Sequence, residues 1–224
     1  MRKNRLMAIG ISAGLALVAG LIVLCWPSDR SLRAQLNSPN SGKRIEAINQ
    51  LSAEGSNAAA KAIAPLIRDQ DARVASRAVH AVAISQLPER VQHVRQAMSD
   101  QRAEVREAAA AATGACGSQA DVQTLTGVLT SREEPQVRAA AAQSLGQLLA
   151  YDSLPALIDA LEDPDEEVRG RAGAAVRALL ANRDMGFRAD DPPERRAEAI
   201  RRIRQWCPAI QRERPAGTPK RKGP

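Results

Sequence analysis

Apolar residues recur along most of the chain at helical spacing, and the pattern repeats every 31 or 32 residues. One stripe is marked by the valines at positions 74, 105, 137 and 168 and continues with small or apolar residues four, seven and eight places later. A second stripe ends at Ile67, Met98, Leu129 and Leu161. Offsets of four, seven and eight describe one face of an α-helix. We therefore expect each unit to be a short helix, a tight turn and a longer helix.

The turns between the paired helices carry helix-start signals. In the last unit, Asp163, Pro164 and Glu166 predict an N-cap, a proline in the first turn and a glutamate that completes a capping box. Asp69 and Asp100 stand at the matching place in two earlier units. We expect these aspartates to begin the longer helices.

These segments resemble a known family. The segment LPALIDALEDPDEEVRGRAGAAVRALL at 154–180 resembles a HEAT repeat of the short HEAT-like, or phycobilisome-lyase-type, subclass, and EVREAAAAATGA at 104–115 and QVRAAAAQSLGQLL at 136–149 fit the same pattern. The resemblance implies an all-α fold, a right-handed α-solenoid of about five helix pairs. Such arrays serve many unrelated roles, so the resemblance is specific for the fold and not for the function.

The repeat pattern also divides the chain. We expect a linker and a degenerate first repeat at 27–55 and four HEAT-like repeats at 56–182. A C-terminal capping helix at 183–208, with Ala199, Ile200, Ile203 and Trp206 as apolar positions, should cover the open end of the stack. The remaining residues, 209–224, are basic and rich in proline and glycine, which predicts a disordered tail.

The first 26 residues have a different character. Residues 6–26 form an uncharged run of 21, long enough as a helix to cross a bilayer. A cleaved secretory signal has a shorter apolar core that ends in a small-residue cleavage site, which this run lacks. A lipoprotein signal needs a small residue just before its cysteine, but Leu24 precedes Cys25. We predict an uncleaved transmembrane signal-anchor helix. The basic residues within 1–5 favour a cytoplasmic N-terminus, which leaves the repeat domain extracytoplasmic, or periplasmic in a Gram-negative bacterium.

Gly10 and Gly14 form a GxxxG pair within this run. Such a pair lets two membrane helices approach closely and suggests a weak homodimer, although small residues that merely tolerate lipid explain it equally well.

The charge of +7 is concentrated at the two ends of the chain. Residues 6–182 contain 17 basic and 19 acidic side chains, a balance of −2. A nucleic-acid-binding array needs a basic stripe on its folded surface, so we expect no nucleic-acid partner. The tail residues Lys220, Arg221 and Lys222 are either solvated or contact anionic lipid or an acidic protein.

An arginine follows the reference valine in three units. Arg106, Arg138 and Arg169 recur with the repeat period, beside acidic residues such as Asp165. They could bind an acidic partner, but a period equal to the repeat favours a structural ladder in which each arginine pairs with an acidic residue of the next unit.

The helix face expected to line the concave side is built mostly of small residues. The larger polar residues on this face are Ser76, His80, Glu107, Gln143 and Arg177, which we predict as the protein-binding set. Small residues there are equally consistent with a smooth groove for a partner and with close helix packing.

Candidate chemistry is sparse. His80 and His93 are not followed by glutamate, unlike the His-Glu pairs that HEAT-type metal hydroxylases use, and the acidic cluster around Asp165 lacks the order of a calcium loop. No catalytic triad, phosphate loop or nucleotide fingerprint is present. Cys116 and Cys207 are expected to be structural thiols. We therefore expect no catalytic residues, no metal and no cofactor.

The sequence thus predicts a membrane-anchored, non-catalytic HEAT-repeat scaffold that binds an unknown protein. An alternative is an enzyme or enzyme accessory of the phycobilin-lyase-like class, against which stand the anchor and an aromatic content of only 2%. A nucleic-acid-binding HEAT protein is the less favoured alternative.

Overall fold

The computed structural model describes residues 29–212, with the side chains of 30–206. The predictions for the transmembrane segment, the Gly10–Gly14 pair and residues 213–224 lie outside this range. Within residues 29–212, no helix combines the length and the apolar character needed to cross a bilayer.

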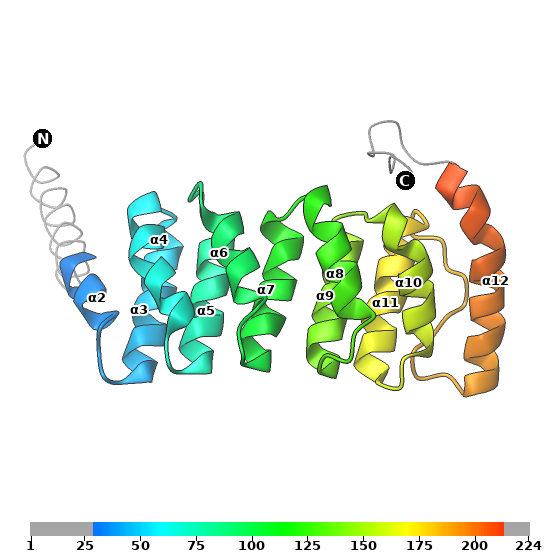
Figure 1. The fold of residues 1–224 in the computed structure, drawn as a ribbon, viewed down its shortest axis with the longest axis horizontal. Helices are drawn as coiled ribbons and strands as arrows, with labels where there is room; N and C mark the ends of the chain where they lie inside the picture. The colour runs from blue at the N-terminus through cyan, green and yellow to red at the C-terminus, as the bar shows by residue number, and fades with distance from the viewer. Residues whose placement is uncertain (1–28, 213–224) are drawn as a thin grey trace, which may run out of the picture.

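The described chain is an all-α solenoid, as the repeat pattern predicts (Figure 1). Five helix pairs follow one another, each made of an outer and an inner helix. The inner helices are α3 (Ser41–Glu54), α5 (Ala72–Ala83), α7 (Ala103–Cys116), α9 (Pro135–Gln147) and α11 (Glu166–Leu179). The outer helices are α2 (Asp29–Gln35), α4 (Asn57–Ile63), α6 (Arg90–Ala97), α8 (Val122–Leu129) and α10 (Leu154–Asp159).

Four short 3-10 turns extend three of the outer helices. Turn η1 (Ala64–Arg68) follows α4, and η2 (Gln119–Asp121) precedes α8. Turns η3 (Tyr151–Ser153) and η4 (Ala160–Glu162) lie before and after α10. The segment predicted as a degenerate first repeat forms the complete pair of α2 and α3. Gly55, at φ 65°, closes α3 in the left-handed conformation that suits glycine.

The chain ends in α12 (Pro193–Arg212), which packs beside α10 at the end of the stack (Figure 1). Its residues Ala199, Ile200 and Ile203 are buried, so this helix covers the last repeat. Two expectations need correction. Trp206, expected as a further apolar contact, is 47% exposed, and residues 209–212, expected in the tail, continue the helix.

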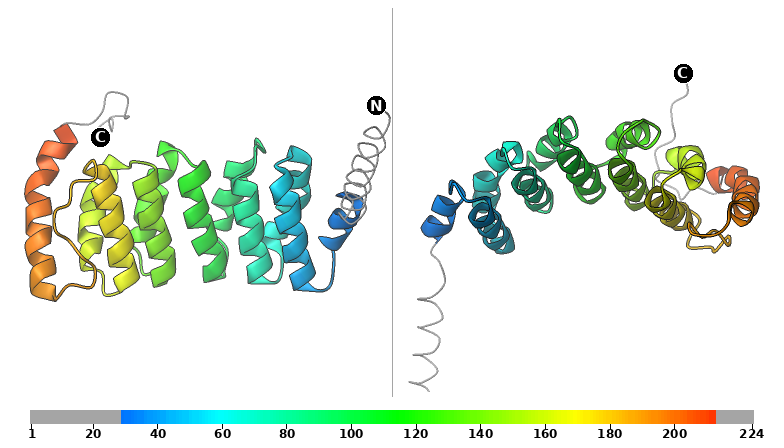
Figure 2. Two further views of the ribbon diagram at one scale, coloured as in Figure 1. Left: turned by 180° about the vertical axis from the view of Figure 1, so that it is seen from behind. Right: turned by 90° about the horizontal axis from the view of Figure 1, so that it is seen from below.

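The pairs stack into an arch. Seen along the helices, the inner helices line its concave side and the outer helices its convex side (Figure 2). The apolar stripes meet between the two layers, where the fully buried side chains include Ile48, Ile63, Leu125, Leu145 and Leu157. Neighbouring inner helices pack against one another, with α9 between α7 and α11.

The arch has two edges that differ in their connections. The turn edge, at the bottom of Figure 1, holds the turns within the pairs: residues 36–40, 69–71, 98–102, 130–134 and 163–165. The connection edge, at the top, holds the links between pairs: residues 55–56, 84–89, 117–121 and 148–153. A long connection, residues 180–192, leaves the top of α11 and descends to the start of α12.

The prediction that Asp163 caps α11 is wrong. Asp165 is the N-cap, and its carboxylate accepts from the N–H groups of Glu167 and Val168 at 2.9 and 3.1 Å. Asp163 acts two residues earlier, where its Oδ1 accepts the N–H of Asp165 at 2.9 Å, so Pro164 lies in the turn before the helix. An aspartate can satisfy an N–H two residues onward as readily as it caps a helix, and the sequence did not distinguish the two.

Candidate protein-binding surface

Four of the five predicted binding residues lie on one polar strip along the concave side. Ser76, His80, Glu107 and Gln143 come from α5, α7 and α9 in succession. The strip is defined here as these four residues together with Arg77, Glu104, Glu167 and Arg171.

Hydrogen bonds between neighbouring inner helices connect the strip. The Ser76 hydroxyl donates to the main-chain oxygen of Glu104 at 2.9 Å. Further along, Arg171 Nη1 donates to Gln143 Oε1 at 2.6 Å, and Arg171 Nη2 donates to Glu167 at 3.3 Å. These hydrogen bonds join α5 to α7 and α9 to α11 within the strip.

The surroundings shift the pKa values of His80 and Glu107 in opposite directions. Partial burial, and then the nearby guanidinium of Arg77, lower the pKa of His80, which favours the neutral imidazole. Burial, and then the carboxylates of Glu167 and Glu104, raise the pKa of Glu107. The carboxylates of Glu104 and Glu167 thus both act on Glu107, and Glu167 is itself paired with Arg171 at 3.3 Å.

Several small residues of this face serve helix packing. Ala139 and Ala142 are buried, and a side chain at Gly146 would place its Cβ 2.8 Å from the Cα of Ala175. At Gly173, a Cβ would meet the ring of Phe187 at 2.9 Å, because residues 180–192 fold over α11.

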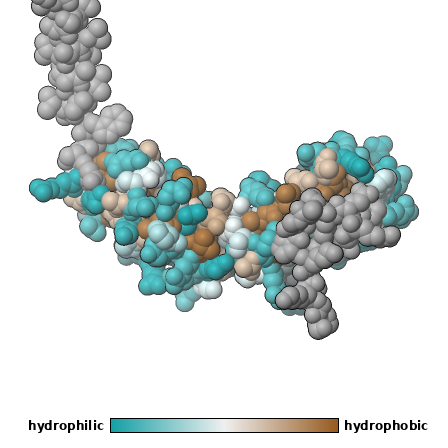
Figure 3. All heavy atoms as spheres, turned by 90° about the horizontal axis from the view of Figure 1, so that it is seen from above, coloured by the Kyte–Doolittle hydropathy of each residue, from teal (hydrophilic) through white to brown (hydrophobic). Residues whose placement is uncertain are grey.

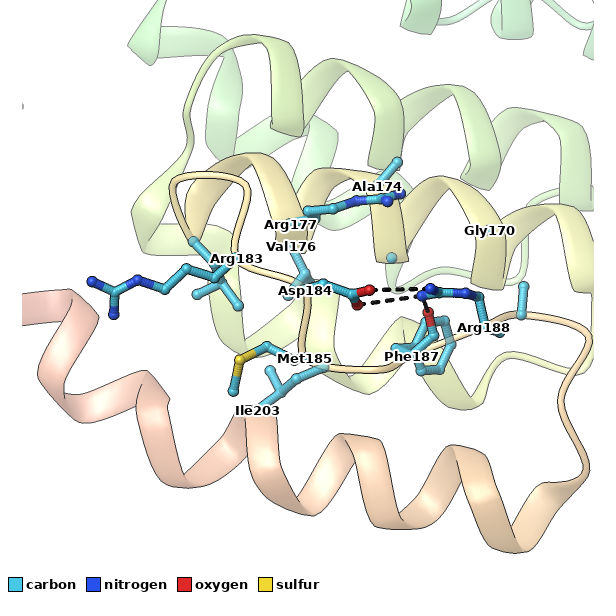
Figure 4. Close-up of a pocket in the computed structure, with 13 residues that line it drawn as sticks. Gly170, Ala174, Val176, Arg177, Arg183, Asp184, Met185, Phe187, Arg188 and Ile203 are labelled. Atoms are coloured by element: carbon cyan, nitrogen blue, oxygen red, sulfur yellow. Dashed lines mark hydrogen bonds and ion pairs between the residues drawn. The ribbon is translucent and has the colours of Figure 1, made fainter.

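Arg177, the fifth predicted residue, does not join the strip. It lines a cavity of about 190 Å³ between α11, the 180–192 connection and α12 (Figure 4). Val176, Leu180 and Ile203 contribute apolar lining. The cavity was missed from sequence, because nothing in the local pattern shows that the connection folds back over α11.

The mouth of this cavity is rich in arginine. Arg188 donates to Asp184 at 3.0 and 3.3 Å, and this contact lowers the pKa of Asp184 to about 2. Arg183 lies with its guanidinium carbon 5.4 Å from the centroid of the Trp206 ring.

Arginines at one recurring position of the inner helices connect successive repeats along the turn edge. The occupants of this position are Arg44, Ala75, Arg106, Arg138 and Arg169. Arg138 shows the pattern: its Nη1 donates to the main-chain oxygen of Glu133 in its own turn, and its Nε and Nη2 donate to Asp163 of the next turn at 3.1 and 2.8 Å. Both side chains are 11% exposed, so little water competes with this pair.

Two further arginines reach forward in the same way. Arg106 contacts Glu133 and Glu134 at 2.8 and 2.7 Å, and Arg44 contacts Asp69 at 2.8 Å. The Arg44 pair was missed, because the first repeat has no valine before the arginine to mark the register.

Two members of the predicted ladder behave differently. Arg169 has no following repeat to meet, and it donates instead to the main-chain oxygens of Asp163, Pro164 and Ala189 at 3.0, 2.9 and 3.0 Å. It thereby holds the 180–192 connection against α11. Asp165 caps α11 and receives no arginine in the described contacts.

Other candidate chemistry is limited. Within residues 29–212, no group of three or more His, Cys, Asp or Glu side chains is placed to hold a metal ion. Cys116 is a free, half-buried thiol whose pKa is raised by that burial, which does not favour a reactive thiolate.

Stacked helical hairpins with a continuous inner layer define an α-solenoid. A family model described as HEAT repeats matches residues 30–114 and 122–204. The chain therefore belongs to the HEAT-repeat family. A comparison with curated proteins gives no match.

Solved structures support the same fold. The complex of CpcE and CpcF of phycocyanin lyase from Nostoc sp. PCC7120 is similar at a TM-score of 0.59 and 21% identity, over 69% of this chain and 65% of that chain. An engineered protein is similar at a TM-score of 0.50 and 17% identity, over 81% of this chain and 97% of that chain. At sequence identities of 21% and 17%, these similarities support the fold of the chain and not its function.

Proposed function

We propose that this protein is a membrane-anchored, non-catalytic HEAT-repeat scaffold whose concave side binds another protein. The observation that carries the proposal is the polar strip, which has members on four inner helices and includes the partly desolvated groups His80 and Glu107. Concave surfaces of α-solenoids suit extended partners, because successive repeats each add a small contact area.

The charges of the strip define the partner. Glu104 and Glu107 of α7 make this part of the strip acidic, so a basic segment of the partner would lie there. Desolvation already raises the pKa of Glu107, and a cation placed beside it would offset that cost. We expect the partner to cross α7 and α9 with a lysine or arginine over Glu107.

The anchor supplies the second part of the mechanism. Residues 6–26 are proposed to span the membrane with the N-terminus cytoplasmic and the repeats on the far side. Confinement near one membrane raises the effective concentration of a partner held at the same surface. A weak dimer through Gly10 and Gly14 would add to this effect.

Site-specific photo-crosslinking in native membranes tests the proposal. A photoreactive amino acid at His80 or Gln143, on the strip, should form one discrete protein adduct. The same group at the exposed Gln92 of outer helix α6 is the matched control and should form none. Equal adducts at all three positions, or adducts only at Gln92, would show that the strip is not the binding surface.

The similarity to the phycocyanin lyase complex favours one alternative, an enzyme or accessory that handles a chromophore. Its test is the absorbance spectrum of the purified full chain after mixing with a bilin or haem. A stable coloured complex that survives gel filtration would favour the alternative over the scaffold.

A further inference from the structure

The exposed large hydrophobic side chains of the described residues lie toward one edge of the arch. They are Ile84, Leu149 and Trp206, at 69%, 46% and 47% exposure. Ile84 closes α5 and Leu149 follows α9, both at the connection edge, and Trp206 lies in the half of α12 that rises toward it. Figure 3 looks down on this edge and shows hydrophobic surface between the polar groups.

The two edges also differ in charge. The charged residues of the four links on the connection edge are Glu89, Asp121 and Asp152, and Asp121 is paired with Arg95 at 2.6 Å. The turn edge is far more heavily charged: Asp69, Asp71, Asp100, Arg102, Arg132, Glu133, Glu134, Asp163 and Asp165. Water solvates the turn edge well, whereas the connection edge exposes apolar area with few charges.

The position of the uncharged run adds a distance limit. The run ends at Trp26, and α2 begins at Asp29, so three Cα–Cα steps of at most about 11 Å in total separate them. Helix α2 descends toward the turn edge, and Asp29 is therefore at its end nearer the connection edge (Figure 1). If the run spans a membrane, the first repeat is held close to the bilayer surface.

We propose that the solenoid lies on the bilayer along its connection edge, with Ile84, Leu149 and Trp206 entering the lipid interface. This inference rests on the proposed anchor. Tryptophan favours the bilayer interface, and Arg183 beside Trp206 suits anionic headgroups. The acidic turn edge then points away from the lipid, and the polar strip runs parallel to the bilayer on the concave side, where it remains open to a partner.

In the alternative geometry, the long axis of the solenoid is perpendicular to the bilayer, and only the first repeat contacts lipid. The two geometries make different predictions for α12, because Trp206 lies at the opposite end of the arch from α2 (Figure 1). Contact of Trp206 with lipid therefore distinguishes a lying arch from a standing one.

Tryptophan quenching by brominated phosphatidylcholine tests the proposal on the full chain in vesicles. In a Trp26→Phe variant, Trp206 is the single tryptophan and should lose at least about half of its fluorescence relative to vesicles without bromine. In a Trp26→Phe, Trp206→Phe background, Ile84→Trp and Leu149→Trp should be quenched to a similar degree. Gln70→Trp and Gln101→Trp, on the exposed turn edge, are the matched controls and should be quenched by less than about a tenth.

The quenching results decide whether the arch lies on the bilayer. Quenching at Gln70 and Gln101 equal to that at Ile84 and Leu149, or no quenching at Trp206, overturns the lying arrangement. Flotation of the vesicles after carbonate washing reports the anchor separately: a chain that floats but is not quenched refutes only this inference. A chain that does not float refutes the anchor and this inference together. Because Trp206 is native, its readout does not depend on whether an introduced tryptophan disturbs folding.

Discussion

The guanidinium of Arg102 donates to the main-chain oxygen of Asp69 at 2.7 Å, across the boundary between two repeats. In the first repeat, the equivalent oxygen, that of Ser38, is bound by Arg44 of the same repeat, also at 2.7 Å. The second repeat has Ala75 where the others carry an arginine. Arg102 thus supplies from the next repeat the contact that Ala75 cannot make.

Because Arg102 makes the contact that an arginine at position 75 would make, we expect Ala75→Arg to compensate for the loss of Arg102. Arg102→Ala should lower the free energy of unfolding by about 1–2 kcal/mol, because two main-chain oxygens lose a charged donor. Ala75→Arg should destabilise the native chain, where Arg102 already fills the site, but should recover part of the loss in the Arg102→Ala variant. Urea denaturation of the two single variants and the double variant measures the coupling, and simple additivity would contradict the assignment.

The pair of Arg138 and Asp163 should contribute more to stability than exposed pairs do. Arg138→Ala leaves a carboxylate that is 11% exposed without its partner, and we expect a loss of about 2–4 kcal/mol. Arg171→Ala is the matched control, since its pair with Glu167 is 48% and 60% exposed and should cost less than about 0.5 kcal/mol. Similar losses in the two variants, measured by chemical denaturation, would refute this account.

Two glycines should respond to alanine with opposite sign. Gly146→Ala places a methyl group 2.8 Å from the backbone of α11 and should destabilise by about 1–3 kcal/mol. At Gly127, in the last turn of α8, a methyl group would meet no atom within 4 Å, so Gly127→Ala should stabilise by up to about 1 kcal/mol through helix propensity. The melting temperatures of the two variants test the close approach of α9 and α11; a tolerated Gly146→Ala would contradict it.

Glu107 should make stability fall as the pH rises. Its pKa in the folded chain is raised above the ordinary value of 4.5, so between 4.5 and the raised value the folded state binds more protons than the unfolded state. The stability that protonation gives is complete below 4.5 and is lost as the pH rises through the folded pKa. Glu107→Gln should remove this dependence and be more stable than the native chain at pH 7.

Denaturation of the native chain and the Glu107→Gln variant at several pH values between 4 and 7 measures this difference. Glu198→Gln, on the exposed side of α12, is the control for loss of a carboxylate. Parallel stability curves for the native chain and Glu107→Gln would show that Glu107 is not desolvated in the folded state.

Much of the fold could be predicted from sequence, since its signals are local and repeated. Val74 and its counterparts mark helices because side chains four, seven and eight residues apart share a helix face. Burial of Ile200 and Ile203 in α12 followed from the same rule. The polar strip was predicted in outline for the same reason, as Ser76, Glu107 and Gln143 occupy related places in successive units.

The sequence by itself determined the helix pairs, their period and the layer to which each belongs, because these depend on residues a few places apart. Only the tertiary structure decided that Arg102 replaces an arginine at position 75, that Phe187 covers Gly173 and that Arg177 lines a cavity. Each of these contacts joins different repeats or the long connection, and its geometry depends on how neighbouring units stack. The spacing of residues within one repeat carries no information about that stacking.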